Sequence, residues 1–203
     1  MKLPNYISAV EANFANISAA RKSHLLRLSL YLQKKFQAGQ VPKVIVICTH
    51  NSRRSHIGQV WLAVAADYYG LPKLETYSGG TEATAFNPRA VAALQRAGLS
   101  ITTNNPTANN PIYNINWNDT DEPYQAFSKK YDDVPNPNSD FAAIMICKDA
   151  EERCPVVYGM DFRFPLPFDD PKAFDDTNLE STKYDERCFE IATEVFYCLS
   201  QIR

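Results

Sequence analysis

The chain of 203 residues lacks several features that would each indicate a class of protein. It has no apolar stretch long enough to span a membrane, and its start, MKLPNYISAVEANF, has no long apolar core of the kind found in signal peptides. It also lacks an excess of basic charge, since its formal net charge is -2. These absences argue against nucleic acid and membrane as partners. We therefore expect a soluble, cytoplasmic protein.

Cysteines are few, and their spacing is not that of a zinc site or of a secreted disulfide framework. An odd number of them is spread over the chain, without paired CxxC motifs or histidines at ligand spacing. The cysteines are Cys48, Cys147, Cys154, Cys188 and Cys198. We expect reduced thiols, some of them reactive, and no metal or other cofactor.

Runs with the pattern of strands alternate with amphipathic stretches along the chain. The runs expected to be strands are residues 42–48, 74–78, 141–147 and, at a sheet edge because of its prolines, 162–168. The stretches expected to be helices are residues 17–37, 55–69, 87–97 and 183–202. This alternation predicts an α/β fold, a three-layer αβα arrangement around a four-stranded parallel sheet.

We expect a single domain over residues 1–203. Residues 1–40 would form an N-terminal helical extension, and residues 41–203 the core. An insertion at about 102–138 is rich in Asn, Pro, Asp and Thr, with aromatic residues between them. It is expected to be a long ordered loop or a short strand–helix unit. It would form either an aromatic wall beside the site or a surface loop with its own apolar cluster.

Three features converge at the carboxyl ends of the predicted strands, where parallel sheets place their sites. These are Cys48, the pair Gly79-Gly80, and Cys147. The first of them opens the segment CTHNSRRS, residues 48–55, between a strand and a helix. Successive backbone N–H groups at a helix N-terminus attract an anion. We therefore predict an oxyanion site here.

The side chains of residues 48–55 suit nucleophilic attack on a bound oxyanion. Cys48 would be present as the thiolate, and Ser55 can donate its hydroxyl to it. Arg54 can hold two oxygens with its planar fork, and Asn51 tolerates the left-handed backbone of a tight cradle. The residues expected to contact the oxyanion are Thr49, His50, Asn51, Ser52 and Arg53.

This loop resembles the C-x4-[CR]-R-[ST] signature of the low-molecular-weight protein tyrosine phosphatases. It is closer still to the CTGNSCRS loop of the thioredoxin-coupled arsenate reductases of the same fold. The segment SGGTEATAFNPRAVAALQRAGLSI, 78–101, and PLPFDDP, 165–171, are similar to further family segments. The resemblance implies the low-molecular-weight phosphatase fold from about residue 43 onward. The N-terminal 40 residues and much of 102–138 lie outside it.

The resemblance also implies roles for three residues beyond the loop. Asp170, directly before Pro171, matches the general acid, with Asp169 as the local competitor. Cys147 and Cys154 match two further cysteines of the arsenate reductases. There, Cys48 would attack arsenate, Cys147 would form a disulfide with Cys48, and Cys154 would then take over the bond with Cys147. A thioredoxin-like protein would reduce that bond.

Three readings of the function follow. The first is an arsenate reductase-like enzyme. The second is a low-molecular-weight protein tyrosine phosphatase that works through a phosphocysteine intermediate, with phosphotyrosine as substrate. The third is a non-catalytic module that binds an oxyanion such as phosphate, or a phosphoprotein. The sequence departs from the family at His50, at Arg53 and at Gln59, where glycine, cysteine and glutamate are usual, so the potassium site of some reductases is not expected.

Overall fold

The computed structural model of the chain describes residues 2–118, 122–147 and 156–203. Its main sheet has four parallel strands in the order β2-β1-β6-β7. The strands are β1 (Lys43–Cys48), β2 (Glu75–Gly80), β6 (Phe141–Met145) and β7 (Met160–Pro165). The predicted α/β fold with a four-stranded parallel sheet is thereby confirmed, and so is the edge position of the proline-containing strand.

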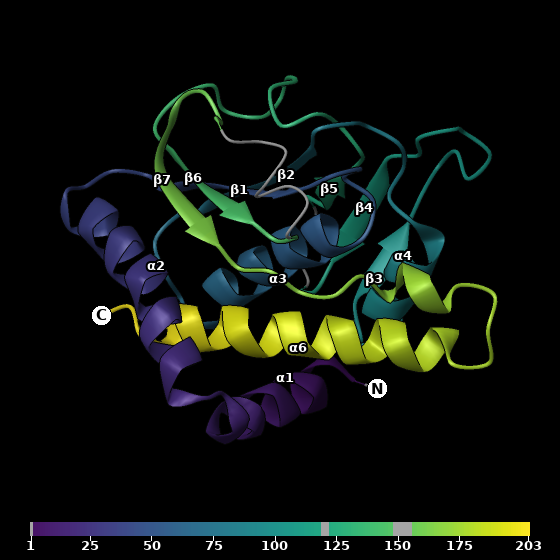
Figure 1. Cartoon of the computed structure of the whole chain (residues 1–203), viewed down its shortest axis with the longest axis horizontal. Coiled ribbons are helices and arrows are strands. Elements are labelled where there is room, and N and C mark those ends of the chain that lie inside the picture. Colours follow the sequence, from purple (N-terminus) through teal and green to yellow (C-terminus); the bar gives the residue numbers. More distant parts are fainter. Residues whose placement is uncertain (1, 119–121, 148–155) are drawn as a thin grey trace.

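Two long helices cover one face of this sheet, as Figure 1 shows. They are α3 (Arg54–Tyr68), which follows β1, and α6 (Glu180–Ser200) near the C-terminus. Gly58 lets α3 lie close to the sheet, since a Cβ there would be only 3.1 Å from side-chain atoms of Val46 and Ile146. A third helix, α4 (Pro88–Arg96), packs on α6, and the side chain of Asn87 caps it by accepting a hydrogen bond from Arg89 N. The sequence thus positions the residues after β1 at the start of a tightly packed helix.

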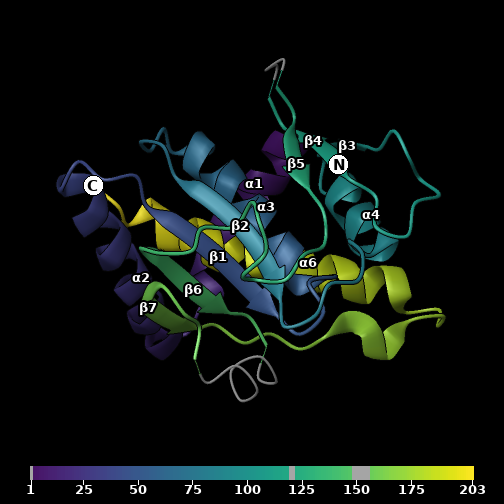
Figure 2. The ribbon, with the colours of Figure 1, turned by 90° about the horizontal axis from the view of Figure 1, so that it is seen from above.

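The other face is crossed by non-helical chain, residues 127–140, seen in front of β1 and β2 in Figure 2. Helices α3 and α6 thus form one of the two helical layers that were predicted. In the described residues, the non-helical chain lies on the other face. Asn136 ties this chain to β2 by donating from its side-chain amide to Ser78 O at 3.0 Å. Beside β7, the short helix η2 (Pro171–Phe174) precedes α6.

The N-terminal region packs on the core of its own chain. It contains α1 (Leu3–Ala12), the short η1 (Asn13–Asn16) and α2 (Ala19–Gln37). The predicted helix 17–37 is α2, with Ser18 as its cap, whereas α1 was not predicted. Figure 1 shows α1 packed across α6. There Tyr6 stacks on Trp61 of α3, with ring centroids 5.3 Å apart.

The insertion differs from both forms expected for it. It contributes to a small antiparallel sheet of β3 (Ser100–Thr102), β4 (Tyr113–Asn116) and β5 (Tyr124–Ala126). Strands of three or four residues carry too little alternation to be recognised in a sequence. Ile101 and Ile115 pair across two of these strands and are buried. Both belong to the same buried core as the main sheet, and the two alternatives for the role of the insertion remain predictions.

None of the helices in the described part of the chain is long and apolar enough to cross a membrane.

Candidate active site

The strand ends predicted to converge do so in the structure. Cys48 ends β1 and is paired in register with Gly80, which ends β2. Cys147 follows β6, the neighbour of β1 on the other side. A Cβ on Gly80 would lie 2.3 Å from Glu82 O and 2.7 Å from Asn51 N. Glycine is therefore required here, because the loop after β1 folds directly against this backbone.

Cys48, Ser55 and Asn51 form a short hydrogen-bonded chain inside the loop. Cys48 Sγ lies 3.0 Å from Ser55 Oγ, and Asn51 donates its side-chain amide to the same Oγ at 2.9 Å. Because Asn51 supplies that proton, the hydroxyl proton of Ser55 remains to be donated to Cys48 Sγ. Asn51 has the left-handed backbone expected of it, with φ 43°, and is fully buried. The loop is thus arranged to donate a hydrogen bond to Cys48 Sγ.

The segment after β5 supports this loop from outside. Lys129 donates its backbone N–H to Asn51 Oδ1 at 2.8 Å and accepts one from Gly80 N at 3.0 Å. Ser128 Oγ donates to His50 O at 3.3 Å. Neither residue belongs to a recognisable motif, since the contacts are made mostly by backbone. Sequence analysis missed them for that reason.

Lys129 is itself unusual, because its side chain is buried. The residue is 5% exposed, and burial lowers the pKa of its ammonium group to about 8. Its Nζ lies 4.6 Å from the centre of the Phe127 ring and donates to Phe127 O at 3.3 Å. The pKa of His56 lies well below its usual value, mainly because His56 is buried and also because the positive charge of Lys129 is near. His56 is therefore a neutral packing residue beside the loop.

The remaining loop side chains contact groups other than Cys48. His50 is 48% exposed at its side chain, with Nε2 3.9 Å from Glu82 Oε2, and Ser52 Oγ donates to Ala85 O at 2.8 Å. Thr49 Oγ1 lies 3.8 Å from Cys147 Sγ. These residues would contact an oxyanion through their backbone N–H groups, and that role remains a prediction.

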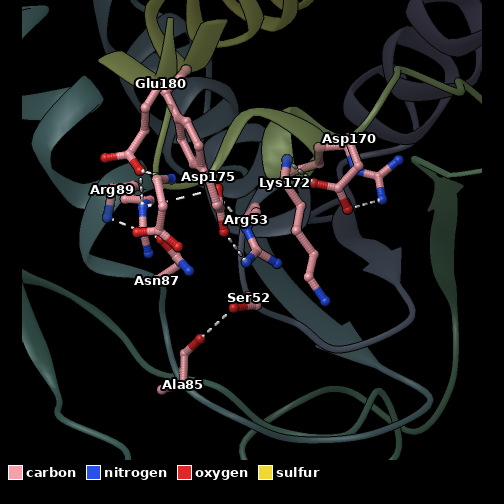
Figure 3. A network of polar contacts seen from close by, with 12 residues as sticks. Ser52, Arg53, Ala85, Asn87, Arg89, Asp170, Lys172, Asp175 and Glu180 are labelled. Carbon is pink, nitrogen blue, oxygen red and sulfur yellow. Dashed lines mark hydrogen bonds and ion pairs between the residues drawn. The ribbon is translucent and has the colours of Figure 1, made fainter. Parts of the chain in front are cut away.

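Arg53 points away from the loop into a network with the segment after Asp170 (Figure 3). Its Nε donates to Tyr184 OH at 2.7 Å and its Nη2 to Asp175 Oδ2 at 3.2 Å. Tyr184 OH donates to Asp175 Oδ1 at 2.7 Å, which closes the triangle. Arg89 of α4 adds charge with its Nε 3.9 Å from Asp175. The side chain of Arg53 therefore fixes the loop to α6 and to the end of η2.

Arg54 is held by the acid-bearing segment. Its Nη2 donates to Asp170 Oδ2 at 2.6 Å and its Nη1 to Phe168 O at 2.7 Å, while its buried Nε has no partner within the described residues. Asp170 also caps η2, since its Oδ1 accepts from Lys172 N at 3.0 Å. Asp169 is different: its side chain is 93% exposed. Of the two candidate acids, Asp170 is the one that lies against Arg54.

Cys147 is the second thiol of the site. It is 1% exposed and lines a cleft of about 460 Å³ together with Arg54, Phe168 and Asp170. Cys154, its predicted partner, lies outside the described residues. The other two cysteines, Cys188 and Cys198, are buried core residues, and this burial raises their pKa values to about 11 and about 12.

Gln59 stands where the family usually has glutamate, the departure for which no potassium site was expected. Its side-chain amide donates to Tyr124 OH at 2.7 Å, so it joins α3 to the insertion. In the part of the chain that the structure describes, no three His, Cys, Asp or Glu side chains gather closely enough to hold a metal ion.

Comparison with solved structures identifies the fold. The YwlE mutant from Bacillus subtilis superposes with a TM-score of 0.51 at 17% identity, covering 79% of this chain and 97% of that one. A low-molecular-weight protein tyrosine phosphatase from T. tengcongensis gives 0.50 at 15% identity, covering 79% and 99%. The chain thus has the fold of the low-molecular-weight phosphatases.

Sequence comparison finds similarity to the same family over part of the chain, and arsenate reductases are among the similar proteins. The sequence model for low molecular weight phosphotyrosine protein phosphatases matches residues 43–121. The arsenate reductase of Bacillus licheniformis is 28% identical over 148 residues, 71% of this chain and 84% of that protein. Arsenate reductase 2 of Staphylococcus haemolyticus is 29% identical over 129 residues, 63% and 77%. The resemblance predicted from the signature loop is confirmed.

Proposed function

We propose that this chain is an arsenate reductase of the low-molecular-weight phosphatase fold. The observation that carries the proposal is a pair of buried thiols at one site. Cys48 lies in a loop that can bind an oxyanion, and Cys147 lies beside it at the end of the adjacent strand. Supporting this, curated relatives at 28–29% identity are arsenate reductases.

The first step is attack of Cys48 on arsenate. The thiolate forms a bond to arsenic, and one arsenate oxygen leaves as water after it has been protonated. Ser55 stabilises the thiolate before attack through the 3.0 Å contact. Arg54 would turn from Asp170 to hold two arsenate oxygens, and Asp170, released from the ion pair, would supply the proton.

The second step transfers two electrons to arsenic. The thiolate of Cys147 attacks Cys48 Sγ, the sulfur–arsenic bond breaks, and arsenic(V) leaves as arsenite, arsenic(III), with the bonding pair. A Cys48–Cys147 disulfide remains. Adjacent strands are about 4.8 Å apart, and one residue of offset adds about 3.3 Å along the strand, so the two Cα atoms would be roughly 6 Å apart. This is within the range that a disulfide requires.

The third step would regenerate Cys48. Cys154 attacks Cys147 Sγ, Cys48 leaves as a thiolate, and the new Cys147–Cys154 disulfide is reduced by a thioredoxin-like dithiol protein. The partners of the enzyme would thus be a small oxyanion and an external reductant.

A phosphatase is the second candidate, favoured by the pairing of Asp170 with the signature loop. It would use Cys48, Arg54 and Asp170 through a phosphocysteine intermediate, which water hydrolyses. Cys147 would then have only a protective role, because it could form a reversible disulfide with an oxidised nucleophile.

One variant separates the two functions. Cys154→Ser is assayed with arsenate plus thioredoxin, thioredoxin reductase and NADPH, and separately with an aryl phosphate. A reductase would lose repeated arsenate turnover and retain ester hydrolysis, with Cys188→Ser as the control that retains both. A phosphatase would show no thioredoxin-dependent turnover of arsenate even before substitution. Absence of both activities in the unaltered chain would favour a module that only binds the oxyanion.

A further inference from the structure

We propose that Arg21, on helix α2, is a positioning residue for the catalytic segment 165–170. This inference rests on the proposed function, because it gives Asp170 the role of proton donor. It assigns a task to the N-terminal extension, which lies outside the region matched by the family model.

Helix α2 binds the backbone that leads to Asp170. His24 Nε2 donates to Pro165 O at 2.6 Å, and Arg21 Nη2 donates to Pro167 O at 3.4 Å. Leu166 N and Phe168 N bond this stretch to Met145 O and Ile146 O at 2.9 and 3.1 Å, but β7 is an edge strand, so no further strand of the described chain is there to bind the carbonyls of Pro165 and Pro167. The two side chains from α2 supply bonds that the sheet cannot.

Arg21 also contacts the ring of Phe168, and the backbone carbonyl of Phe168 in turn binds Arg54. The guanidinium carbon of Arg21 lies 5.3 Å from the ring centre, and that of Arg187 lies 6.0 Å from it. The ring is held by cation–π attraction to both. Phe168 N donates to Ile146 O at 3.1 Å, and Phe168 O accepts from Arg54 at 2.7 Å. Displacement of Phe168 would therefore move both Arg54 and Asp170.

Arg21 is rigid enough for this task because a buried carboxylate holds it. Its Nε lies 2.9 and 3.0 Å from the two carboxylate oxygens of Glu194, and its Nη2 lies 2.8 Å from one of them. Glu194 is 8% exposed and belongs to α6. A forked ion pair of this kind fixes direction as well as distance. Since a displacement of about 1 Å can cost on the order of 100-fold in rate, fixing this segment matters for catalysis.

The test compares Arg21→Ala with Lys35→Ala in the full-length chain. Lys35 also joins α2 to β7, but its 2.6 Å ion pair is with Asp161, which lies outside segment 165–170. The measured quantity is kcat/KM for phenyl phosphate, a poor leaving group, and for p-nitrophenyl phosphate, a good one. Proton donation matters mainly for the poor leaving group.

We expect Arg21→Ala to lower kcat/KM about 10-fold for phenyl phosphate and no more than about twofold for p-nitrophenyl phosphate. Arg21→Lys, which keeps the charge but lacks the fork, should restore only part of the loss. Lys35→Ala should leave the ratio of the two substrates unchanged. If Arg21→Ala fails to fold, Arg21→Gln is measured in its place, with the same expectation.

Equal losses on both substrates, or the same ratio change in Lys35→Ala, would overturn the positioning role while leaving the proposed function intact. If the unaltered chain hydrolyses neither ester, the role of Asp170 as acid fails, and the inference fails with it.

Discussion

The guanidinium of Arg54 and the carboxylate of Asp170 form an ion pair, with Nη2 and Oδ2 2.6 Å apart, although 116 residues separate them in sequence. The arginine that should hold the oxyanion is therefore occupied by the residue that should protonate the leaving group. An incoming anion has to compete with Asp170 for Arg54.

Removing that competition should strengthen anion binding. We expect Asp170→Asn to bind inorganic phosphate about 10-fold more tightly, because the variant lacks a negative charge at Arg54. Hydrolysis of aryl phosphates should fall by about 10² to 10³, because the proton donor is lost. Calorimetric titration and kcat measure the two effects. Asp169→Asn is the matched control and should change neither; phosphate binding no tighter than in the unaltered chain would contradict the competition.

The hydroxyl of Ser55 should control the reactivity of Cys48. We expect Ser55→Ala to slow alkylation of Cys48 by iodoacetamide at pH 6 about 10-fold, since a hydrogen bond to a charged group contributes about 1.5–3 kcal/mol. Mass spectrometry of the modified peptide measures the rate. Ser52→Ala, whose hydroxyl donates to Ala85 O instead, should react like the unaltered chain. Equal rates in the two variants would show that Ser55 does not act on the sulfur.

The triangle of Arg53, Tyr184 and Asp175 should stabilise the fold. Asp175→Asn would leave the largely buried guanidinium of Arg53 without its carboxylate, and we expect a loss of about 2 kcal/mol in the free energy of unfolding. Asp176→Asn, a change at an 87% exposed neighbour, should cost less than about 1 kcal/mol. Urea unfolding measures both. A similar small effect in the two variants would mean that the triangle contributes nothing.

Burial of Lys129 should make stability depend on pH. Its pKa is about 8 in the folded chain, against about 10.4 for an unfolded lysine. Below pH 8 both states are charged. Between pH 8 and about 10, the folded state has lost a proton that the unfolded state keeps, so the free energy of unfolding rises with pH.

Lys129→Met removes the pH-dependent contribution of Lys129 to the free energy of unfolding. The gain in stability from the substitution should be largest below pH 8, at most about 3 kcal/mol, and should shrink by pH 9.5. Urea unfolding at pH 7 and pH 9.5 measures it. Lys130→Met, at an exposed neighbour, should show no such pH dependence. A gain that is constant with pH would rule out a titrating Lys129.

Much of the fold and the centre of the site could be predicted, because their signals are local. The unbroken run of residues 43–48 predicts a buried strand, and the loop with its helix follows directly. Asn51, Ser55 and Cys48 lie within eight residues, so the hydrogen bonds among them follow from one loop conformation. The short strands β3, β4 and β5 escaped prediction because three or four residues carry little periodicity.

The sequence by itself determined the loop of residues 48–55 and the parallel sheet that presents it, because each depends on neighbours in the chain. Only the tertiary structure decided which residues support them. Lys129 reaches Asn51 across 78 residues, Asp175 reaches Arg53 across 122, and Arg21 reaches Pro167 across 146. Such contacts depend on how distant segments pack, and no local pattern of residues encodes them.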